Sequence, residues 1–236
     1  MIKAVLFDLD DTLYDYEKTH KKAMKEVYTF LKKEINLSQK KFLELFKKSK
    51  EEVKMELEGT ASSHNRVLYF QRFVEKTHGT LEASLVKKLY RTYWDFFIKD
   101  MKIGGGVLET LKELKKRNMK IIIVSDMTTY VQLRKIIKLK INNYVDYLVT
   151  SEETGSEKPH SIMFLQGLRK VNSLPSEAIM VGDSRNKDVV GANSVGIKTI
   201  WITKEKNFPK EKGFKKPTYI IKKISEVLKI VEDLNN

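Results

Sequence analysis

Several features common in other proteins are absent from this sequence, and each absence excludes a class of function. The 236 residues contain no cysteine, which excludes disulfides, thiolate catalysis and a cysteine-based zinc site. No stretch approaches the ~18 apolar residues that a membrane-spanning helix requires. The first residues reach an acid, Asp8, too early for a secretory signal. We therefore expect a cytoplasmic protein with no membrane partner. The absence of thiols fits the reducing environment of the cytoplasm.

Acidic residues are outnumbered by basic ones, so the chain carries a formal net charge of +14. A strongly basic protein can bind nucleic acid or anionic membranes. The lysines, however, are spread along the chain and mixed with 31 acidic residues, and the dense stretch 204–223 has few aromatics and no nucleic-acid motif. We interpret the charge as a solvated lysine-rich surface and expect no nucleic-acid partner. A filter-binding assay with a salt titration would test the alternative.

The period of the apolar residues changes along the chain, and these changes predict two units. Residues 3–7 form a short apolar run before an acidic cluster, as a buried parallel strand does. From about Tyr16 to Lys99 the spacing is helical and predicts four helices packed on one another, with Thr80 capping the last. Strands are predicted further on at 121–124, 145–149, 178–181, 199–202 and 218–221, with helices near 106–117, 128–139, 161–172, 188–194 and 223–234.

The alternation of strands and helices predicts an α/β protein, with a Rossmann-like parallel sheet covered by helices on both faces. We expect residues 1–14 and 101–236 to form this core and residues 15–100 to form an inserted four-helix unit. In open sheets of this kind, ligands bind at the carboxyl ends of the strands. Candidate functional residues are therefore sought where predicted strands end.

The strongest chemical signal is the segment FDLDDT at 7–12, which follows the first predicted strand. Asp8 and Asp10 stand two residues apart where the backbone can leave its regular path, so both carboxylates can face one site. Two such carboxylates repel each other unless a cation neutralises them. Magnesium, a hard ion that takes oxygen ligands, fits this role. The alternative for this segment alone is a loop of solvated acids.

Three later segments follow other predicted strands, and each supplies a group that phosphoryl transfer requires. Ser125 offers a hydroxyl to a phosphate oxygen, although a serine there would more often cap the next helix. Lys158 precedes a proline-started helix and can hold a phosphate as a point charge. Asp183 can face a metal while Asp188 supports it from behind. The alternative for these two acids is a helix cap and a surface residue.

Taken together, the segments resemble the haloacid dehalogenase superfamily of phosphohydrolases. The matching motifs, in the family's order and spacing, are Asp8-x-Asp10-x-Thr12, Ser125, Lys158 and Gly182-Asp183-Ser184-x-x-x-Asp188. The likeness covers essentially the whole chain, and the helical insert resembles the family's α-helical cap. It implies a phosphatase of a small phosphorylated metabolite. Archaeal members of similar build are glyceraldehyde 3-phosphate phosphatases, and others act on acylneuraminate or nucleotide phosphates.

The resemblance also implies roles in the reaction. Asp8 would attack phosphorus and become an aspartyl phosphate. Asp10 would protonate the leaving alkoxide and then take a proton from the hydrolytic water. Thr12 would hold the loop, and Ser125 and Lys158 would bind the transferring phosphoryl group. Thr12 is therefore grouped with the phosphate-binding residues.

The cofactor that the resemblance implies is Mg²⁺. The ion would be held by the Asp8 carboxylate, the Asp10 backbone carbonyl and Asp183, with Asp188 behind them. Its part would be to neutralise charge and to align the attacking and leaving groups. We expect a small phosphorylated metabolite as the ligand, and a monomer or a homodimer.

Two further residues are candidates for substrate binding. Asp126 stands where relatives often carry Asn, and a carboxylate facing a phosphate is unfavourable. We group it with the phosphate-binding residues but expect its side chain to cap the helix that starts near Thr128. Residues 62–66 form a candidate lip in the helical insert, in which Arg66 would contact an anionic substrate. The alternative is that Ser63 caps a helix and Arg66 is solvated.

Three alternatives to a phosphatase share features of this sequence. Haloacid dehalogenation uses the same nucleophile but needs neither magnesium nor a second acid, so Asp10 argues against it. A sugar phosphomutase uses the full set of residues and stays open as an alternative. A binding protein on an inactive enzyme fold would be expected to lack at least one of these groups, and none is missing.

Overall fold

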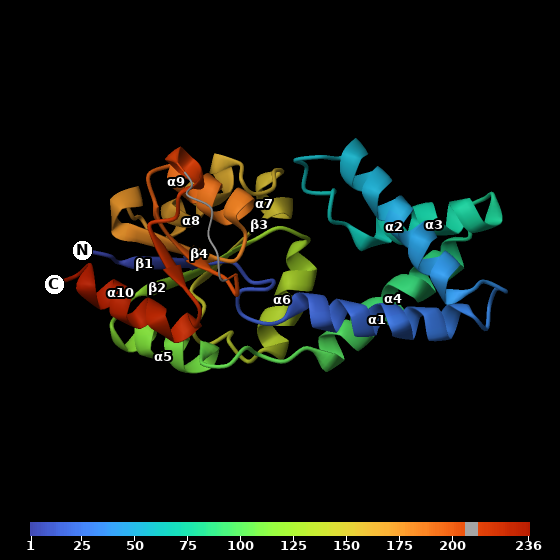
Figure 1. Cartoon of the computed structure of the whole chain (residues 1–236), viewed down its shortest axis with the longest axis horizontal. Coiled ribbons are helices and arrows are strands. Elements are labelled where there is room, and N and C mark those ends of the chain that lie inside the picture. The colour runs from blue at the N-terminus through green and yellow to red at the C-terminus, as the bar shows by residue number, and fades with distance from the viewer. Residues whose placement is uncertain (206–211) are drawn as a thin grey trace. The chain divides into compact units, whose positions relative to one another are not determined.

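The computed structural model describes residues 1–205 and 212–236 and divides the chain into two compact units (Figure 1). One unit consists of Met1–Asp15 and Lys102–Asn236, and the other is Tyr16–Met101. Each boundary lies one residue later than the sequence predicts. Every expected motif residue except Arg66 belongs to the first unit.

The first unit is built on a parallel sheet of six strands in the order β3-β2-β1-β4-β5-β6. The predicted α/β class with a Rossmann-like sheet is confirmed. Phe7 pairs with Ile123 on one side and Val181 on the other, so the three central strands end at nearly the same level. The strands are β1 Ala4–Phe7, β2 Lys120–Ser125, β3 Tyr147–Thr150, β4 Ala178–Gly182, β5 Lys198–Ile202 and β6 Tyr219–Ile221.

Helices cover both faces of the sheet, with α5 and α10 on one side and α8 and α9 on the other (Figure 1). Between the sheet and α8, buried side chains such as Leu6, Ile122 and Phe164 form a continuous apolar cluster. The helices are α5 Val107–Lys116, α6 Thr129–Lys138, α7 Ser151–Thr154, α8 Ser161–Lys170, α9 Val190–Ser194 and α10 Val227–Asp233. A π-helix, Arg185–Val189, leads into α9, and the sequence pattern predicted neither it nor α7.

The second unit contains the four predicted helices, α1 Tyr16–Leu31, α2 Gln39–Glu56, α3 Arg66–His78 and α4 Ala83–Asp100. Its interior is rich in aromatic side chains that contact one another, among them Phe42, Phe73 and Tyr93. The prediction that Thr80 caps α4 is wrong, because α3 ends at His78 with Gly79 as its C-cap, and the helical backbone of α4 begins only at Ala83, after Glu82.

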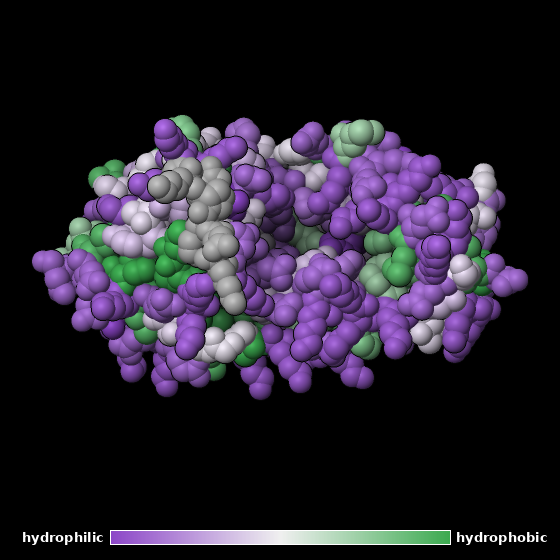
Figure 2. Space-filling view, in the orientation of Figure 1, coloured by the Kyte–Doolittle hydropathy of each residue, from purple (hydrophilic) through white to green (hydrophobic). Residues whose placement is uncertain are grey.

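The surface agrees with the expectation from composition. On the face shown in Figure 2, hydrophilic side chains are spread over both units and apolar ones form small patches. The lysine-rich stretch 204–223 falls partly outside the described residues. Among the helices that the structure describes, none has the length and apolar character needed to span a bilayer.

Candidate active site

The end of β1 carries Asp8, which is only 5% exposed and continues the strand pairing through a hydrogen bond from its backbone N–H to the Val181 carbonyl. The Thr12 hydroxyl lies 3.1 Å from Asp8 Oδ2 and 3.3 Å from Asp183 Oδ1. The same hydroxyl accepts the Asp183 backbone N–H at 3.1 Å. Thr12 therefore ties the loop after β1 to the loop after β4.

Lys158 reaches into the site from the loop before α8 and is buried. Its Nζ donates to Asp8 Oδ1 and, at 2.7 Å, to Asp188 Oδ1. Burial alone would lower the pKa of Lys158, but Asp188, Asp8 and Asp126 outweigh it and raise the pKa well above its ordinary value. The lysine therefore stays charged, as a group that neutralises carboxylates and binds a phosphate must.

The two acids after β4 are held in place by the local backbone. Asp188, 1% exposed, lies in the π-helix and accepts the Ser184 backbone N–H at 3.0 Å. The Asp183 carbonyl accepts the Trp201 indole N–H at 2.7 Å. The alternative of a capping Asp183 and a surface Asp188 is wrong, because Ser184 caps the π-helix and Asp188 is buried against Lys158.

The carboxylates of Asp8, Asp183 and Asp188 form a group whose ligand oxygens all lie within 4.8 Å of one another. Burial and then the neighbouring acids raise the pKa of Asp183 to about 7. Burial also raises the pKa of Asp8, which Lys158 opposes and Asp188 and Asp183 reinforce. One lysine thus faces three crowded acids, and oxygen ligands at this spacing fit a hard divalent cation.

The Asp10 side chain lies outside this group of three carboxylates and forms an ion pair with a different lysine, Lys135. Lys135 Nζ, from α6, donates to Asp10 Oδ1 at 2.7 Å and to Oδ2 at 2.8 Å. The Tyr14 hydroxyl donates to Asp10 Oδ1 at 2.6 Å. Neither partner was predicted. The available signal was Lys135 itself, a charge one turn from both Val131 and Leu139 on the apolar face of its helix.

Ser125 ends β2 and is buried, and its side chain does not cap α6. Gln132, on α6, donates to its hydroxyl at 2.6 Å and to the Asp126 carbonyl at 2.9 Å. Thr128 is the residue before α6, and its own side chain makes no capping hydrogen bond; the Thr129 backbone N–H donates to Glu152 instead. Gln132 is a third residue that the sequence did not predict for the site, because an isolated polar residue on a helix does not indicate which group it will contact.

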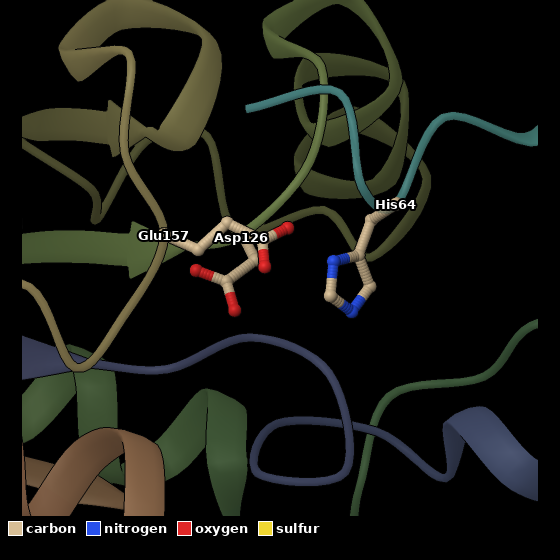
Figure 3. A group of neighbouring side chains, drawn as sticks. All are labelled: His64, Asp126 and Glu157. Carbon is tan, nitrogen blue, oxygen red and sulfur yellow. The ribbon is translucent and has the colours of Figure 1, made fainter. Parts of the chain in front are cut away.

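The prediction that Asp126 caps α6 is wrong, because basic and backbone donors on other loops bind its carboxylate. It accepts the Lys158 backbone N–H at 2.9 Å and the Lys187 ammonium at 2.7 Å. Burial raises the pKa of Asp126, but Lys158 and Lys187 outweigh it and hold the pKa below its usual range. Figure 3 shows the side chains of Asp126 and Glu157 next to each other, and Glu157 lies 4.0 Å from Lys187.

Arg66 lies inside the helical unit, at the start of α3, and is only 6% exposed. Asn65 caps the helix, so the alternative of a capping Ser63 and a solvated Arg66 is wrong. The guanidinium carbon lies 5.1–5.5 Å from the ring centroids of Tyr16, Tyr93 and Trp94. Its Nη2 donates to the Tyr16 hydroxyl.

Two hydrogen-bond donors of Arg66 are left over. Its Nε and Nη1 make no hydrogen bond within the part of the chain that the structure describes. Such donors are costly when they are buried and unsatisfied. The surrounding rings offer a cation–π attraction but no negative charge.

Comparisons with known proteins identify relatives of the whole chain. A ribulose-1,5-bisphosphate 5-phosphatase of Halopiger xanaduensis is 40% identical over 202 residues, which are 85% of this chain and 84% of the relative. A glyceraldehyde 3-phosphate phosphatase of Methanopyrus kandleri is 31% identical over 99% of both chains. The crystal structure of a HAD phosphatase from Thermococcus onnurineus covers 98% of both chains with a TM-score of 0.77 and 26% identity.

The family model of haloacid dehalogenase-like hydrolases matches residues 5–202. This range includes every motif residue, from Asp8 to Asp188, that carried the resemblance in the sequence. The expected resemblance is therefore confirmed, and the chain belongs to the haloacid dehalogenase-like hydrolases.

Proposed function

We propose that this protein is a magnesium-dependent phosphatase that hydrolyses a small phosphorylated metabolite through an aspartyl phosphate on Asp8, with residues 15–100 acting as its cap. The observation that carries the proposal is that Asp8, Asp183 and Lys158, which are distant in sequence, meet at the ends of adjacent strands. Together they offer a nucleophile, a metal ligand and a phosphate-binding cation. These are the groups that phosphoryl transfer requires.

In the proposed first step, an oxygen of Asp8 attacks phosphorus as the bond to the leaving oxygen breaks. Asp10 gives a proton to that leaving oxygen, which departs as an alcohol. Lys158 and Ser125 bind the non-bridging phosphoryl oxygens. Water then attacks phosphorus, Asp10 takes its proton, and inorganic phosphate leaves with Asp8 regenerated as a carboxylate.

The metal site of the proposal consists of Asp8, Asp183 and the Asp10 backbone carbonyl. Asp188 orients Lys158 beside these ligands through their 2.7 Å contact. Mg²⁺ bound there would neutralise the crowded carboxylates and screen the charge of the phosphoryl group. The raised pKa of Asp183 and the separation of the oxygens support a cation at this position.

For the substrate, the names of the relatives support a small phosphorylated sugar. We also propose that Arg66 binds an anionic group of the substrate. Its guanidinium is permanently charged, and two of its donor nitrogens make no hydrogen bond within the described residues. A phosphate or carboxylate oxygen would accept a charge-assisted hydrogen bond from either of these nitrogens.

The decisive experiment replaces the nucleophile. Asp8→Asn should abolish phosphate release from a panel of sugar phosphates in the presence of Mg²⁺, because an amide cannot form the acyl phosphate. Acid quenching of the wild type during turnover should trap a phosphoryl group on the peptide that contains Asp8. Asp15→Asn, at an exposed acid in the same segment, is the matched control and should keep full activity.

Three results would contradict the proposal. Substantial turnover by a folded Asp8→Asn protein would exclude the covalent route. Conversion of one sugar phosphate into its isomer, without free phosphate, would identify a phosphomutase instead. Halide release from a haloacid in the absence of Mg²⁺ would identify a dehalogenase.

A further inference from the structure

Lys135 is the most completely buried charged side chain near the proposed site, with 0% of it exposed. Its ammonium contacts both carboxylate oxygens of Asp10 and lies 5.7 Å from the Tyr14 ring centroid and 3.8 Å from Met127 Sδ. The Asp10 side chain is 26% exposed. The pair therefore joins a fully desolvated cation to an acid that still reaches solvent.

Such a pair is hard to explain by stability. Desolvating an ammonium costs several kcal/mol, and replacing a buried ion pair by apolar residues of similar volume is often neutral or stabilising. Val131 and Ile136 on the same helix already supply apolar contacts. An ammonium at position 135 does what an apolar side chain could not, because it holds a carboxylate from both oxygens in one orientation.

We propose that Lys135, together with Tyr14, is a positioning residue that fixes the Asp10 carboxylate for proton transfer to the leaving oxygen. The inference rests on the proposed function, in which Asp10 is the general acid. Lys158 forms ion pairs with the proposed nucleophile Asp8 and with Asp188, whereas Lys135 forms an ion pair with Asp10. The two lysines therefore have separable effects on the reaction.

A second residue of helix α6, Gln132, provides a matched control for this inference. Gln132 lies one turn before Lys135 and donates to Ser125, which in the proposed function binds the phosphoryl group and not the leaving oxygen. Loss of Gln132 should weaken the reaction of every phosphate ester to a similar degree. Loss of Lys135 should matter only where the leaving oxygen needs a proton.

The experiment compares kcat/KM for two esters, because this ratio reports the steps up to breakage of the ester bond. An alkyl phosphate such as glyceraldehyde 3-phosphate leaves as an alkoxide that must be protonated, whereas p-nitrophenolate leaves without a proton. Lys135→Met should lower kcat/KM for the alkyl ester by about 10- to 100-fold, a part of what a general acid contributes. It should lower kcat/KM for p-nitrophenyl phosphate by less than about threefold.

Tyr14→Phe removes the other donor to Asp10 and should show the same preference more weakly, which keeps the test decisive if Lys135→Met fails to fold. Gln132→Leu should lower both ratios by similar factors. Equal losses on the two esters in the Lys135 and Tyr14 variants, or no loss on either, would overturn the inference. Absence of turnover by the wild type on both esters would instead refute the proposed function.

Discussion

At the scale of single residues, four of the carboxylates around the proposed site each form an ion pair with a particular lysine, whereas no such pair is seen for Asp183 among the described residues. Lys158 forms ion pairs with Asp8 and Asp188, Lys135 with Asp10, and Lys187 with Asp126. Since an unpaired buried charge is expensive, this matching lets several acids lie close together without unfolding the loops.

Gly182 tests how tightly Asp188 is packed. A Cβ at this position would lie 2.3 Å from Asp188 Oδ2 and 2.6 Å from its Cβ, far inside normal contact. Gly182→Ala should therefore displace Asp188 from Lys158, lowering kcat by at least about tenfold and the free energy of unfolding by about 1–3 kcal/mol. Chemical denaturation and steady-state kinetics would measure both. Gly105→Ala, where a Cβ meets nothing within 4 Å, is the matched control.

Arg66 gives a prediction about substrate choice. Arg66→Gln should raise KM for ribulose 1,5-bisphosphate, which carries a second phosphate, by about 10- to 100-fold, as expected for loss of a charged hydrogen bond. The KM for p-nitrophenyl phosphate, which has no second anionic group, should change by less than about threefold. Equal changes for both compounds would show that Arg66 only supports the packing of its aromatic neighbours.

At the scale of elements, the parallel register explains why short motifs can meet. Phe7 is level with Ile123 and Val181, so the residues that follow β1, β2 and β4 emerge at one edge of the sheet. Helix α6 then adds a layer behind this edge through Gln132 and Lys135. The strands place the residues of the proposed site, and α6 contacts two of them, Ser125 and Asp10.

Helix α1 carries a pH-sensitive element of the helical unit. Burial, followed by Arg66, Lys50 and Lys21, lowers the pKa of His20 to about 3. In the unfolded chain, this histidine has a pKa of about 6.5. Between about pH 3 and pH 6.5 the unfolded chain therefore binds more protons than the folded protein, so the free energy of unfolding falls as the pH drops below about 6.5. Between pH 7 and pH 5 this histidine should cost about 2 kcal/mol.

His20→Gln should remove this pH dependence while keeping a hydrogen-bonding partner for the Tyr93 hydroxyl, which lies 2.8 Å from His20 Nδ1. Urea denaturation of both proteins at pH 7 and pH 5 provides the measurement. The loss of stability between the two pH values should be smaller in the variant by about 2 kcal/mol. An identical loss in both proteins would show that His20 titrates normally.

At the scale of the whole molecule, a net charge of +14 coexists with a local excess of carboxylates at one edge of the sheet. The overall positive field favours approach of anionic substrates, whereas the carboxylates favour a cation. A phosphate ester together with Mg²⁺ satisfies both.

Metal binding should be visible in the stability of the folded protein. A ligand that binds only the native state stabilises it by about 2.7 kcal/mol at a concentration 100 times its Kd. Millimolar Mg²⁺ should therefore raise the Tm of the wild type, and chelation should reverse the shift. Asp183→Asn should lose most of this response, whereas Glu34→Gln, at an exposed acid of the helical unit, should keep it. An equal response in all three proteins would contradict the proposed metal site.

The sequence pattern was enough to predict the parallel sheet, the inserted helices and the order of the motifs. Local pattern carries this information, because buried strands are short apolar runs and the residues that follow parallel strands emerge at one edge. The motifs taken jointly, and the family resemblance that they carry, also predicted that Lys158 and Asp188 lie near Asp8, and Lys158 contacts both acids in the structure.

Which hydrogen-bond donors contact each carboxylate could be seen only in the tertiary structure. Asp126 binds the Lys158 backbone and Lys187 instead of its own helix, Asp10 binds Lys135 and Tyr14, and Arg66 is buried instead of solvated. These pairings join elements far apart in the chain, and a side-chain contact of a few ångströms depends on packing that no local period encodes. For this reason the sequence could suggest Asp8 as the proposed nucleophile, whereas it gave no prediction of Lys135 and Tyr14, which contact the proposed general acid Asp10.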